Sequence, residues 1–287
     1  MEAGRALGER GHQVLLLEAR NDLGGRVLRE ALLPGLAPWR RVVDWRLTEL
    51  ASLPDVQLFP GSGATASDIL EFGARHVIVA TGARWRRDGR GRTTGRPVLG
   101  HDLPHVFTPD DLLDDLAAGT WRLPNGPVVI YDDDHYVIGG ALAEVAAGHG
   151  HPVTLVTPAP LVSAWTQYTL EQTRIERRLR ALGVRTLTRL TLGEVEAGKV
   201  TVASVIDGAV EQIEAAAVVL IGDRQPEAPL VTGLQPALER GQLETLTVIG
   251  DAEAPGLIAH AVFAGHRAAR QFGEPIDRDA IEFRRVD

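Results

Sequence analysis

Val128-Val129-Ile130-Tyr131 opens the most informative stretch of this sequence. These β-branched and aromatic residues predict a buried strand. The small and apolar residues from Gly140 to Gly148 predict a helix, and Val153 to Val156 predict a second strand. A strand, a helix and a strand in this order form one βαβ unit, from which parallel sheets are built.

The same alternation continues on both sides of this unit. Upstream, the pattern predicts helices over 2–10, 47–53 and 66–72, and strands over 13–18, 56–59 and 76–80. Downstream it predicts helices over 169–182 and 257–272, and strands over 184–187, 200–206, 209–213, 216–221 and 246–249. We expect the strands at 200–206 and 209–213 to pair in antiparallel fashion.

Residues 84–126 are rich in Arg, Gly, Pro and Asp and lack a long periodic segment, which indicates a crossover between domains. The fold class we expect is therefore α/β, with two Rossmann-like nucleotide-binding units, one inserted in the other, in a glutathione-reductase-like arrangement. The first domain would comprise residues 1–105 and 225–287, and the inserted domain residues 106–224.

Composition narrows the class of protein. The 287 residues carry 30 basic and 38 acidic side chains, a net charge of −8, without a basic block, so we expect no nucleic-acid partner. Cysteine is absent, which excludes a thiol nucleophile or a cysteine-bound iron–sulfur cluster within this sequence. No apolar run approaches the roughly 20 residues of a membrane span, and no leader pattern opens the sequence. We expect a cytoplasmic protein with no membrane partner.

Several residues in the first domain suggest a nucleotide site. Glu18 ends a strand that follows a helix, where a Rossmann unit places a carboxylate against a ribose, although a solvated strand end would look the same. Gly24-Gly25-Arg26 would let the backbone approach a pyrophosphate and supply a guanidinium, although an ordinary surface turn also explains it.

Two further turns follow buried strands of the same domain. Thr81-Gly82 comes after the strand at 76–80, and Gly250-Asp251 after the strand at 246–249. In a flavin site such an aspartate accepts hydrogen bonds from the ribityl chain, while the helix that follows directs its positive end to phosphate.

The corresponding turn of the second domain reads Asp132-Asp133-Asp134-His135. A working dinucleotide turn needs glycines there, and three aspartates would repel a pyrophosphate. We therefore predict that this unit does not bind NAD(P). A metal site is the alternative, but sequential residues rarely converge on one ion, and we assign none.

The remaining polar motifs have ordinary explanations. Thr169 and Gln172 fit a helix capping box. His260 and His266 are six residues apart, which does not place them on one helix face, so we assign neither a role. No pattern of nucleophile and base or of paired carboxylates indicates a catalytic residue.

Several stretches together resemble the C-terminal half of the trimethylamine and dimethylamine dehydrogenase and dienoyl-CoA reductase family. They are Glu18-(x)5-Gly24-Gly25, Ala80-Thr81-Gly82-Ala83-Arg84-Trp85, Val156-Thr157-Pro158, Trp165-Thr166-(x)2-Thr169-Leu170-Glu171-Gln172 and Gly250-Asp251-Ala252-Glu253-Ala254-Pro255. The resemblance is closer to the amine dehydrogenases than to the reductases.

The resemblance implies cofactors and partners. Such proteins carry a barrel with FMN and an iron–sulfur cluster, followed by two nucleotide-fold domains that bind FAD or only ADP. It implies that the nucleotide lies among Glu18, Gly24, Gly25, Arg26, Thr81, Gly82, Gly250 and Asp251. FMN and the cluster would belong to a barrel domain or subunit, and electrons would pass to a protein acceptor.

The sequence departs from the family at its start, because the barrel, the first strand and its glycine-rich turn have no counterpart. The missing strand would lie centrally in the sheet, and each buried Val or Ile in it would contribute about 1.5–3 kcal/mol. Three or four such residues rival the net stability of a typical protein, about 5–15 kcal/mol. We therefore expect a truncated start or a strand supplied by another chain.

Three functions stay open. The first, which we prefer, is the FAD- or ADP-binding module of an amine dehydrogenase-like oxidoreductase. The others are a noncatalytic nucleotide-binding or docking module, and a stand-alone FAD-dependent NAD(P)H reductase.

Overall fold

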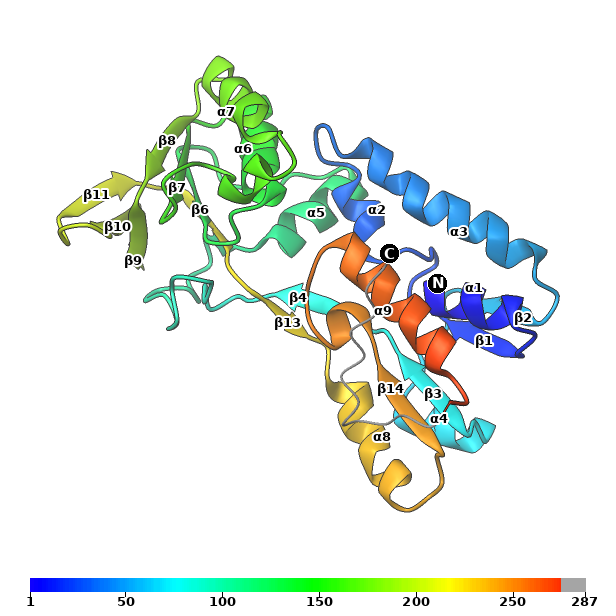
Figure 1. Ribbon diagram of the computed structural model, residues 1–287. Coiled ribbons are helices and arrows are strands. Elements are labelled where there is room, and N and C mark those ends of the chain that lie inside the picture. Colours follow the sequence, from blue (N-terminus) through cyan, green and yellow to red (C-terminus); the bar gives the residue numbers. More distant parts are fainter. Residues whose placement is uncertain (275–287) are drawn as a thin grey trace, which may run out of the picture. The chain divides into compact units, whose positions relative to one another are not determined.

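The computed structural model describes residues 1–274, and they form two compact units of α/β structure (Figure 1). Of the described residues, the first unit comprises Met1–Gly25, Arg41–Gly82 and 226–274, and the second comprises Arg26–Arg40 and Ala83–Gln225. Residues 275–287 of the predicted first domain lie outside the described residues.

The helices and strands of the first unit alternate along the chain. They are α1 (Glu2–Glu9), β1 (Val14–Leu17), α3 (Arg40–Ser52), β2 (Val56–Phe59), α4 (Ala66–Phe72), β3 (His76–Val79), α8 (Pro229–Glu239), β14 (Thr245–Val248), the 3-10 turn η3 (Gly250–Ala252) and α9 (Ile258–Gln271). Strands β1 and β2 pair in parallel, and β3 pairs in parallel with β14. Within residues 1–274 these two pairs form separate two-stranded sheets.

Helices α1 and α9 cover both strand pairs. Val14 of β1 and Ile78 of β3 pack against the same buried cluster of Ala6, Leu7 and Ala269. On the other face of β3, the buried Val77 and Val79 pack against α4 and α8. The predicted strands at 56–59 and 76–80 and the predicted helix at 66–72 are therefore confirmed, each within one residue.

The second unit is built on a five-stranded parallel sheet with the order β5-β12-β6-β7-β8. Its elements are α2 (Arg26–Glu30), η1 (Ala37–Trp39), β4 (Ala83–Trp85), β5 (Val106–Phe107), α5 (Pro109–Ala118), β6 (Val128–Asp132), α6 (Val137–Gly148), β7 (Val153–Thr157), η2 (Ala164–Gln167), α7 (Gln172–Ala181), β8 (Arg185–Thr188), β9 (Leu190–Glu196), β10 (Lys199–Ser204), β11 (Val210–Glu214), β12 (Ala217–Ile221) and β13 (Arg224–Pro226). Strands β6 and β12 are wholly buried, as their continuous apolar sequences require in a sheet covered on both faces.

The predicted βαβ unit is confirmed as β6, α6 and β7, and the predicted antiparallel pair as β10 and β11. Strand β9, which the sequence analysis missed, completes that sheet in the order β11-β10-β9. None of the described helices is both long and apolar enough to cross a membrane.

The stretch at 84–126 contains a helix that the composition concealed. α5 begins at Pro109, and the Asp111 carboxylate accepts hydrogen bonds from the backbone N–H and the hydroxyl of Thr108, at 2.8 and 2.9 Å. Gly119 ends the helix in a left-handed conformation. These start and stop signals were present in the sequence.

The units also differ in their bounds from the expected domains, because residues 26–40 and 83–105 cluster with the second unit. Local contacts to α5 explain this. Arg29 of α2 pairs with Asp110 and Asp114, at 3.2 and 2.8 Å, and the Trp85 N–H donates to Asp110 at 2.9 Å.

The capping box expected at Thr169 and Gln172 does not form, and α7 begins at Gln172 rather than at 169. The Thr169 hydroxyl donates to Glu171 at 2.7 Å, and the Gln172 amide donates to the Val162 carbonyl at 3.3 Å. Both side chains thus bind the segment before the helix, and the Gln172 amide also donates to Glu176 within α7 at 3.1 Å.

Candidate functional site

Four of the predicted site residues meet at the carboxyl end of the β3–β14 pair. The register aligns Val79 with Val248, and the Ile249 N–H donates to the Val79 carbonyl at 3.0 Å. The turns Thr81-Gly82 and Gly250-Asp251 therefore begin side by side, at the edge where parallel α/β sheets bind ligands.

Both turns at this edge depend on glycine. Gly82 has φ 81° and Gly250 has φ 62°, which are conformations that side chains with a Cβ rarely adopt. The Thr81 hydroxyl donates to the Glu227 carbonyl at 2.9 Å, and the Glu227 N–H donates to the Gly82 carbonyl at the same distance. The chain leaving β3 is thereby fixed to the chain that enters α8.

Asp251 is almost buried and stands before the amino end of α9. Its carboxylate accepts a hydrogen bond from the Gly256 N–H at 2.9 Å. The Leu257 N–H at the start of α9 donates to the imidazole of His260 at 3.0 Å. His260, to which the sequence analysis gave no role, therefore caps this helix.

Glu18 lies half-buried just after β1. Its carboxylate accepts the Arg20 N–H at 2.9 Å, and its own N–H donates to the Phe59 carbonyl at 3.0 Å. Its charge also acts on the α-amino group of Met1, at the start of α1, whose pKa burial lowers. Glu18 is thus held at the amino end of α1, as a ribose-binding carboxylate of a Rossmann unit would be.

The Gly24-Gly25-Arg26 turn divides between the two units. Gly24 and Gly25 have φ 130° and 56° and belong to the first unit, whereas Arg26 begins α2 in the second. The Arg26 guanidinium lies 2.7 Å from both carboxylate oxygens of the buried Glu30. A single guanidinium nitrogen, Nη1, makes both contacts, and this charge-assisted pair fixes Arg26 within α2.

The hydrogen-bonding groups at this edge of the first unit are of the types that can bind an adenine nucleotide. Glu18 and Asp251 supply carboxylates for hydroxyl groups, and the left-handed glycines let the backbone come close to a phosphate. The α9 helix has 14 residues, so its amino end carries the partial positive charge that attracts anions.

The turn after β6 in the second unit is occupied by its own carboxylates. Asp132 accepts the backbone N–H groups of Asp134 and His135, at 3.2 and 2.9 Å. Asp133 accepts those of Thr93 and Thr94, at 3.0 and 2.8 Å. The N–H groups of Asp134 and His135, which would face a phosphate in a dinucleotide turn, are therefore bound by Asp132 of the same turn.

The two adjacent aspartates have opposite proton affinities. Burial, together with the charge of Asp134, raises the pKa of Asp132 to about 7, and its Oδ2 has no hydrogen-bond partner within residues 1–274. Burial also acts to raise the pKa of Asp133, but hydrogen bonds from His135, Thr94 and Thr93 outweigh it and hold that pKa below its usual value. The backbone of His135 is left-handed, with φ 65°.

The sequence analysis had seen the aspartates of this turn but not the loop they bind. The partners of Asp133 are about 40 residues upstream, in the stretch taken as a crossover. Among residues 1–274 no group of His, Cys, Asp and Glu side chains is arranged to hold a metal ion.

Comparison with known proteins gives the family context. Residues 108–219 match the family described as OYE-like second alpha/beta domain. Dimethylamine dehydrogenase from Hyphomicrobium sp. (strain x) is 35% identical over 94% of this chain and 40% of its own length.

Two solved structures are similar over almost the whole chain. Histamine dehydrogenase from Rhizobium sp. 4-9 matches with a TM-score of 0.93 and 42% identity, over 99% of this chain and 44% of its own. The 6-hydroxypseudooxynicotine amine oxidase from Pseudomonas geniculata N1 matches with a TM-score of 0.90 and 38% identity, over 95% of this chain and 40% of its own. The chain thus spans about two fifths of the length of these relatives. The chain is therefore similar to part of each of these amine dehydrogenases and oxidases.

Proposed function

From this homology we propose that the chain is the FAD- or ADP-binding module of an amine dehydrogenase-like oxidoreductase. Substrate oxidation would take place on FMN in a separate barrel domain or subunit, and electrons would pass to a protein acceptor. The observation that carries the proposal is the β3–β14 register, which brings Thr81-Gly82 and Gly250-Asp251 together at one sheet edge.

In this proposal each residue of the first unit has a binding role. Glu18 accepts hydrogen bonds from the adenosine ribose, and the backbone at Gly24 and Gly25 approaches the pyrophosphate. Asp251 accepts hydrogen bonds from the ribose or ribityl hydroxyls on the other side. When bound as FAD, the group would supply redox chemistry, whereas ADP would serve structure alone. We place no catalytic residue in this chain.

The turn after β6 in the second unit favours this proposal over a stand-alone NAD(P)H reductase. Asp132 and Asp133 bring negative charge to the turn and already bind four backbone N–H groups. A dinucleotide phosphate would have to displace the bonds from Asp134 and His135 to Asp132 and lie close to the charged Asp133. We therefore propose that the second unit is a degenerate NAD(P)-binding domain.

The divided sheet of the first unit supports a partner segment. β1 and β3 lie beneath the same helices, yet within residues 1–274 β1 pairs with β2 and β3 pairs with β14. A two-stranded sheet is marginal by itself. We propose that an extended segment from outside the described residues pairs with β1 and β3 and makes one five-stranded sheet.

The test is an absorption spectrum of the purified chain, followed by chromatography of any nucleotide released on heating. FAD or ADP in stoichiometric amount supports the proposal. Colourless protein that releases nothing, and that does not bind added ADP in calorimetry, would reject a nucleotide site in this chain. NADH oxidation by the chain alone would instead support the reductase.

A further inference from the structure

The segment between η3 and α9 is closed by two side chains that accept consecutive backbone N–H groups. The Asp251 carboxylate accepts the Gly256 N–H at 2.9 Å, and Nδ1 of the His260 imidazole accepts the Leu257 N–H at 3.0 Å. Asp251 comes from η3 and His260 from the first turn of α9. Side chains from both ends of the segment 251–257 therefore hold it in place.

His260 supplies a cap that the residue before α9 lacks. The N-cap residue is Leu257, whose side chain has no hydrogen-bond acceptor. Its carbonyl accepts the N–H groups of His260 and Ala261, at 3.0 and 3.2 Å, so the helix begins directly after it. The His260 side chain takes the part that the third helical residue has in a capping box, where it reaches back to the N-cap N–H.

The imidazole of His260 lies against the bare backbone of Gly256. A Cβ atom on residue 256 would lie 2.8 Å from Nδ1 of His260 and 3.2 Å from its Cβ, so a side chain at this position would displace the ring. His260 is nevertheless exposed to solvent. Protons therefore reach the ring without any opening of the fold.

The hydrogen bond to Leu257 exists only while His260 is neutral. A neutral imidazole has one nitrogen that accepts and one that carries a proton, and here Nδ1 is the acceptor. Protonation adds a hydrogen to Nδ1, which then faces another N–H group and cannot accept from it. Histidine side chains change their charge between about pH 5 and 8, so mild acid breaks this contact.

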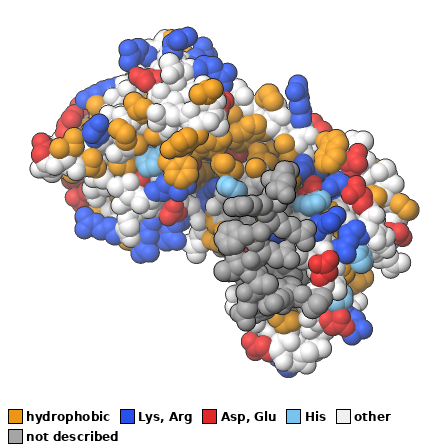
Figure 2. Space-filling view, viewed as in Figure 1, with side chains coloured by type: hydrophobic (Ala, Val, Ile, Leu, Met, Phe, Trp, Pro, Cys, Tyr) orange, Lys and Arg blue, Asp and Glu red, His pale blue; other side chains and the backbone are white. Residues whose placement is uncertain are grey.

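The other charged groups around α9 are mixed in sign. The helix packs against α1 and η3, and against β3 through the cluster around Ala264. The titratable and charged groups of these elements are Asp251 and Glu253 beside η3, the α-amino group of Met1 with Glu2, Arg5, Glu9 and Arg10 at α1, and His76 on β3. Most of them pair with one another or with Arg267 and Glu244. On the face shown in Figure 2, acidic and basic side chains are likewise interspersed over the first unit.

The segment that His260 holds also carries groups of the proposed nucleotide site. Asp251 stands at its start, and the hydrogen bond of Asp251 goes to Gly256, the neighbour of Leu257. At its end, the N–H groups of Ile258 and Ala259 in the first turn of α9 have no intrahelical acceptor and are the donors that a phosphate would meet. Release of the Leu257 N–H loosens the chain between these two parts of the site.

We propose that His260 is a positioning residue that makes nucleotide binding by the first unit depend on pH, a role that rests on the proposed nucleotide site. Neutral His260 keeps Asp251 and the amino end of α9 in one arrangement. When His260 is protonated, the nucleotide must order the segment on binding, and its affinity falls. The charge that protonation adds is exposed and screened by salt, so the lost contact decides the sign.

Calorimetric titration of the full chain with ADP at about pH 8 and about pH 5.5 tests this. The carbonyl of an asparagine can accept the Leu257 N–H and does not titrate, so His260→Asn should bind ADP as the wild type does at the higher pH. On acidification the wild-type affinity should fall roughly three- to tenfold more than that of His260→Asn, which corresponds to one hydrogen bond. His260→Ala has no acceptor and should be weaker than the wild type by the same factor already at the higher pH.

The matched control is His149→Asn, because His149 is also exposed and also bonds one backbone group, the Val145 carbonyl at 3.0 Å, but in the second unit. It should keep the pH dependence of the wild type. Nitrogen chemical shifts of the His260 ring give a readout that needs no nucleotide, and in the neutral ring the proton should lie on Nε2.

The possible outcomes separate the two proposals. A proton on Nδ1 of the neutral ring, or ADP affinities of wild type and His260→Asn that change equally with pH, would overturn the role of His260 and leave the nucleotide site standing. A wild-type chain that binds no ADP at either pH would reject the nucleotide site and the role of His260 with it.

Discussion

Two sheet edges of this chain have the same position in their folds and opposite chemistry. At the end of β3 and β14, glycines 82 and 250 open the turns, and the carboxylate of Asp251 accepts a backbone N–H five residues ahead. At the end of β6, Asp132 and Asp133 turn back onto backbone N–H groups and are fully buried. A sheet edge can bind an anion from outside only where the chain's own side chains do not already occupy its backbone N–H groups, and at the second edge Asp132 and Asp133 occupy them.

Removing Asp133, the buried anion of the second unit, should have the largest effect on stability. The fully buried Asp133 accepts the N–H groups of Thr93 and Thr94, in a part-buried loop, and pairs with the buried His135. Asp133→Ala removes the acceptor from all three donors, and a donor left unsatisfied away from water costs about 1–3 kcal/mol. We expect the free energy of unfolding of the second unit to fall by about 3 kcal/mol. Urea denaturation measures it, and a loss below about 1 kcal/mol would show that water replaces the carboxylate.

Substitution in the turn after β3 of the first unit should weaken ligand binding more than it weakens folding. In Gly82→Val, a β-branched residue would have to adopt φ 81° at the carboxyl end of β3. We expect ADP affinity in calorimetry to fall at least tenfold, about 1.4 kcal/mol. Gly119→Val is the matched control, since Gly119 has φ 68°, with open space around it, in the second unit. Equal losses in both variants would mean that strain, not the site, is responsible.

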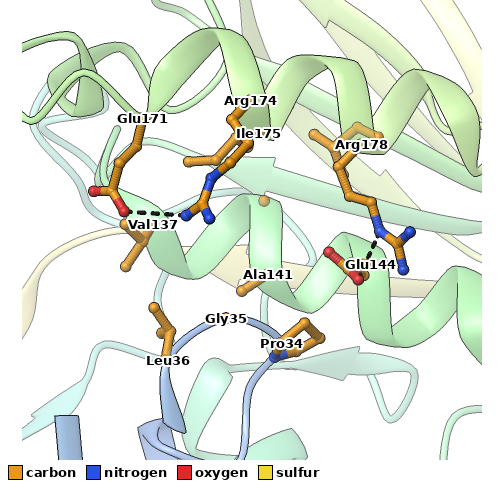
Figure 3. Close-up of a pocket in the computed structure, with 12 residues that line it drawn as sticks. Pro34, Gly35, Leu36, Val137, Ala141, Glu144, Glu171, Arg174, Ile175 and Arg178 are labelled. Atoms are coloured by element: carbon orange, nitrogen blue, oxygen red, sulfur yellow. Dashed lines mark hydrogen bonds and ion pairs between the residues drawn. The ribbon is translucent and has the colours of Figure 1, made fainter. Parts of the chain in front are cut away.

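Much of the structure at both sheet edges could be predicted from the sequence. The features that could not be predicted all depend on contacts between residues far apart in the chain. The strands and the turns 81–82 and 250–251 follow from local pattern, because β-branched runs and glycines act within a few residues. The partners of Asp133 lie about 40 residues away in sequence. The pocket drawn in Figure 3 is lined by three separate segments, 34–36, 137–144 and 171–179. Contacts between residues so far apart in sequence depend on the tertiary fold, and no local sequence pattern predicts them. The helix α5 is different, since Thr108-Pro109 and Gly119 did signal it.

The stability of the second unit should also depend on pH, because Asp132 binds a proton there. Its pKa of about 7 lies above the unfolded value of about 3.9, so the carboxyl binds its proton more tightly in the folded chain. This stabilisation is complete below pH of about 4 and is lost as the pH rises through 7. Asp132→Asn should therefore raise the unfolding free energy by about 1 kcal/mol at pH 8 and lower it by about 1–2 kcal/mol at pH 5, because proton binding by Asp132 is worth about 1.4 kcal/mol per pH unit between the two pKa values. The gain stays small because the amide places a donor where Oδ2 had no partner. Melting temperatures at both pH values measure it, and a gain equal at pH 5 and 8 would contradict the assigned proton affinity.

Glu18→Gln should give the smallest effect and bears most directly on the nucleotide. Glu18 accepts the Arg20 N–H through its carboxylate, and the glutamine carbonyl can accept the same bond, so the melting temperature should hardly change. A ribose hydroxyl would lose a charge-assisted hydrogen bond and keep a neutral one, which is worth roughly 0.6 kcal/mol or threefold in affinity. The useful measurement is the ratio of ADP affinity to inorganic pyrophosphate affinity in wild type and variant. If Glu18 binds the ribose, ADP alone weakens, because pyrophosphate has no ribose. If both ligands weaken together, Glu18 acts only on the shape of the turn, and the first unit binds phosphate without recognising the nucleoside.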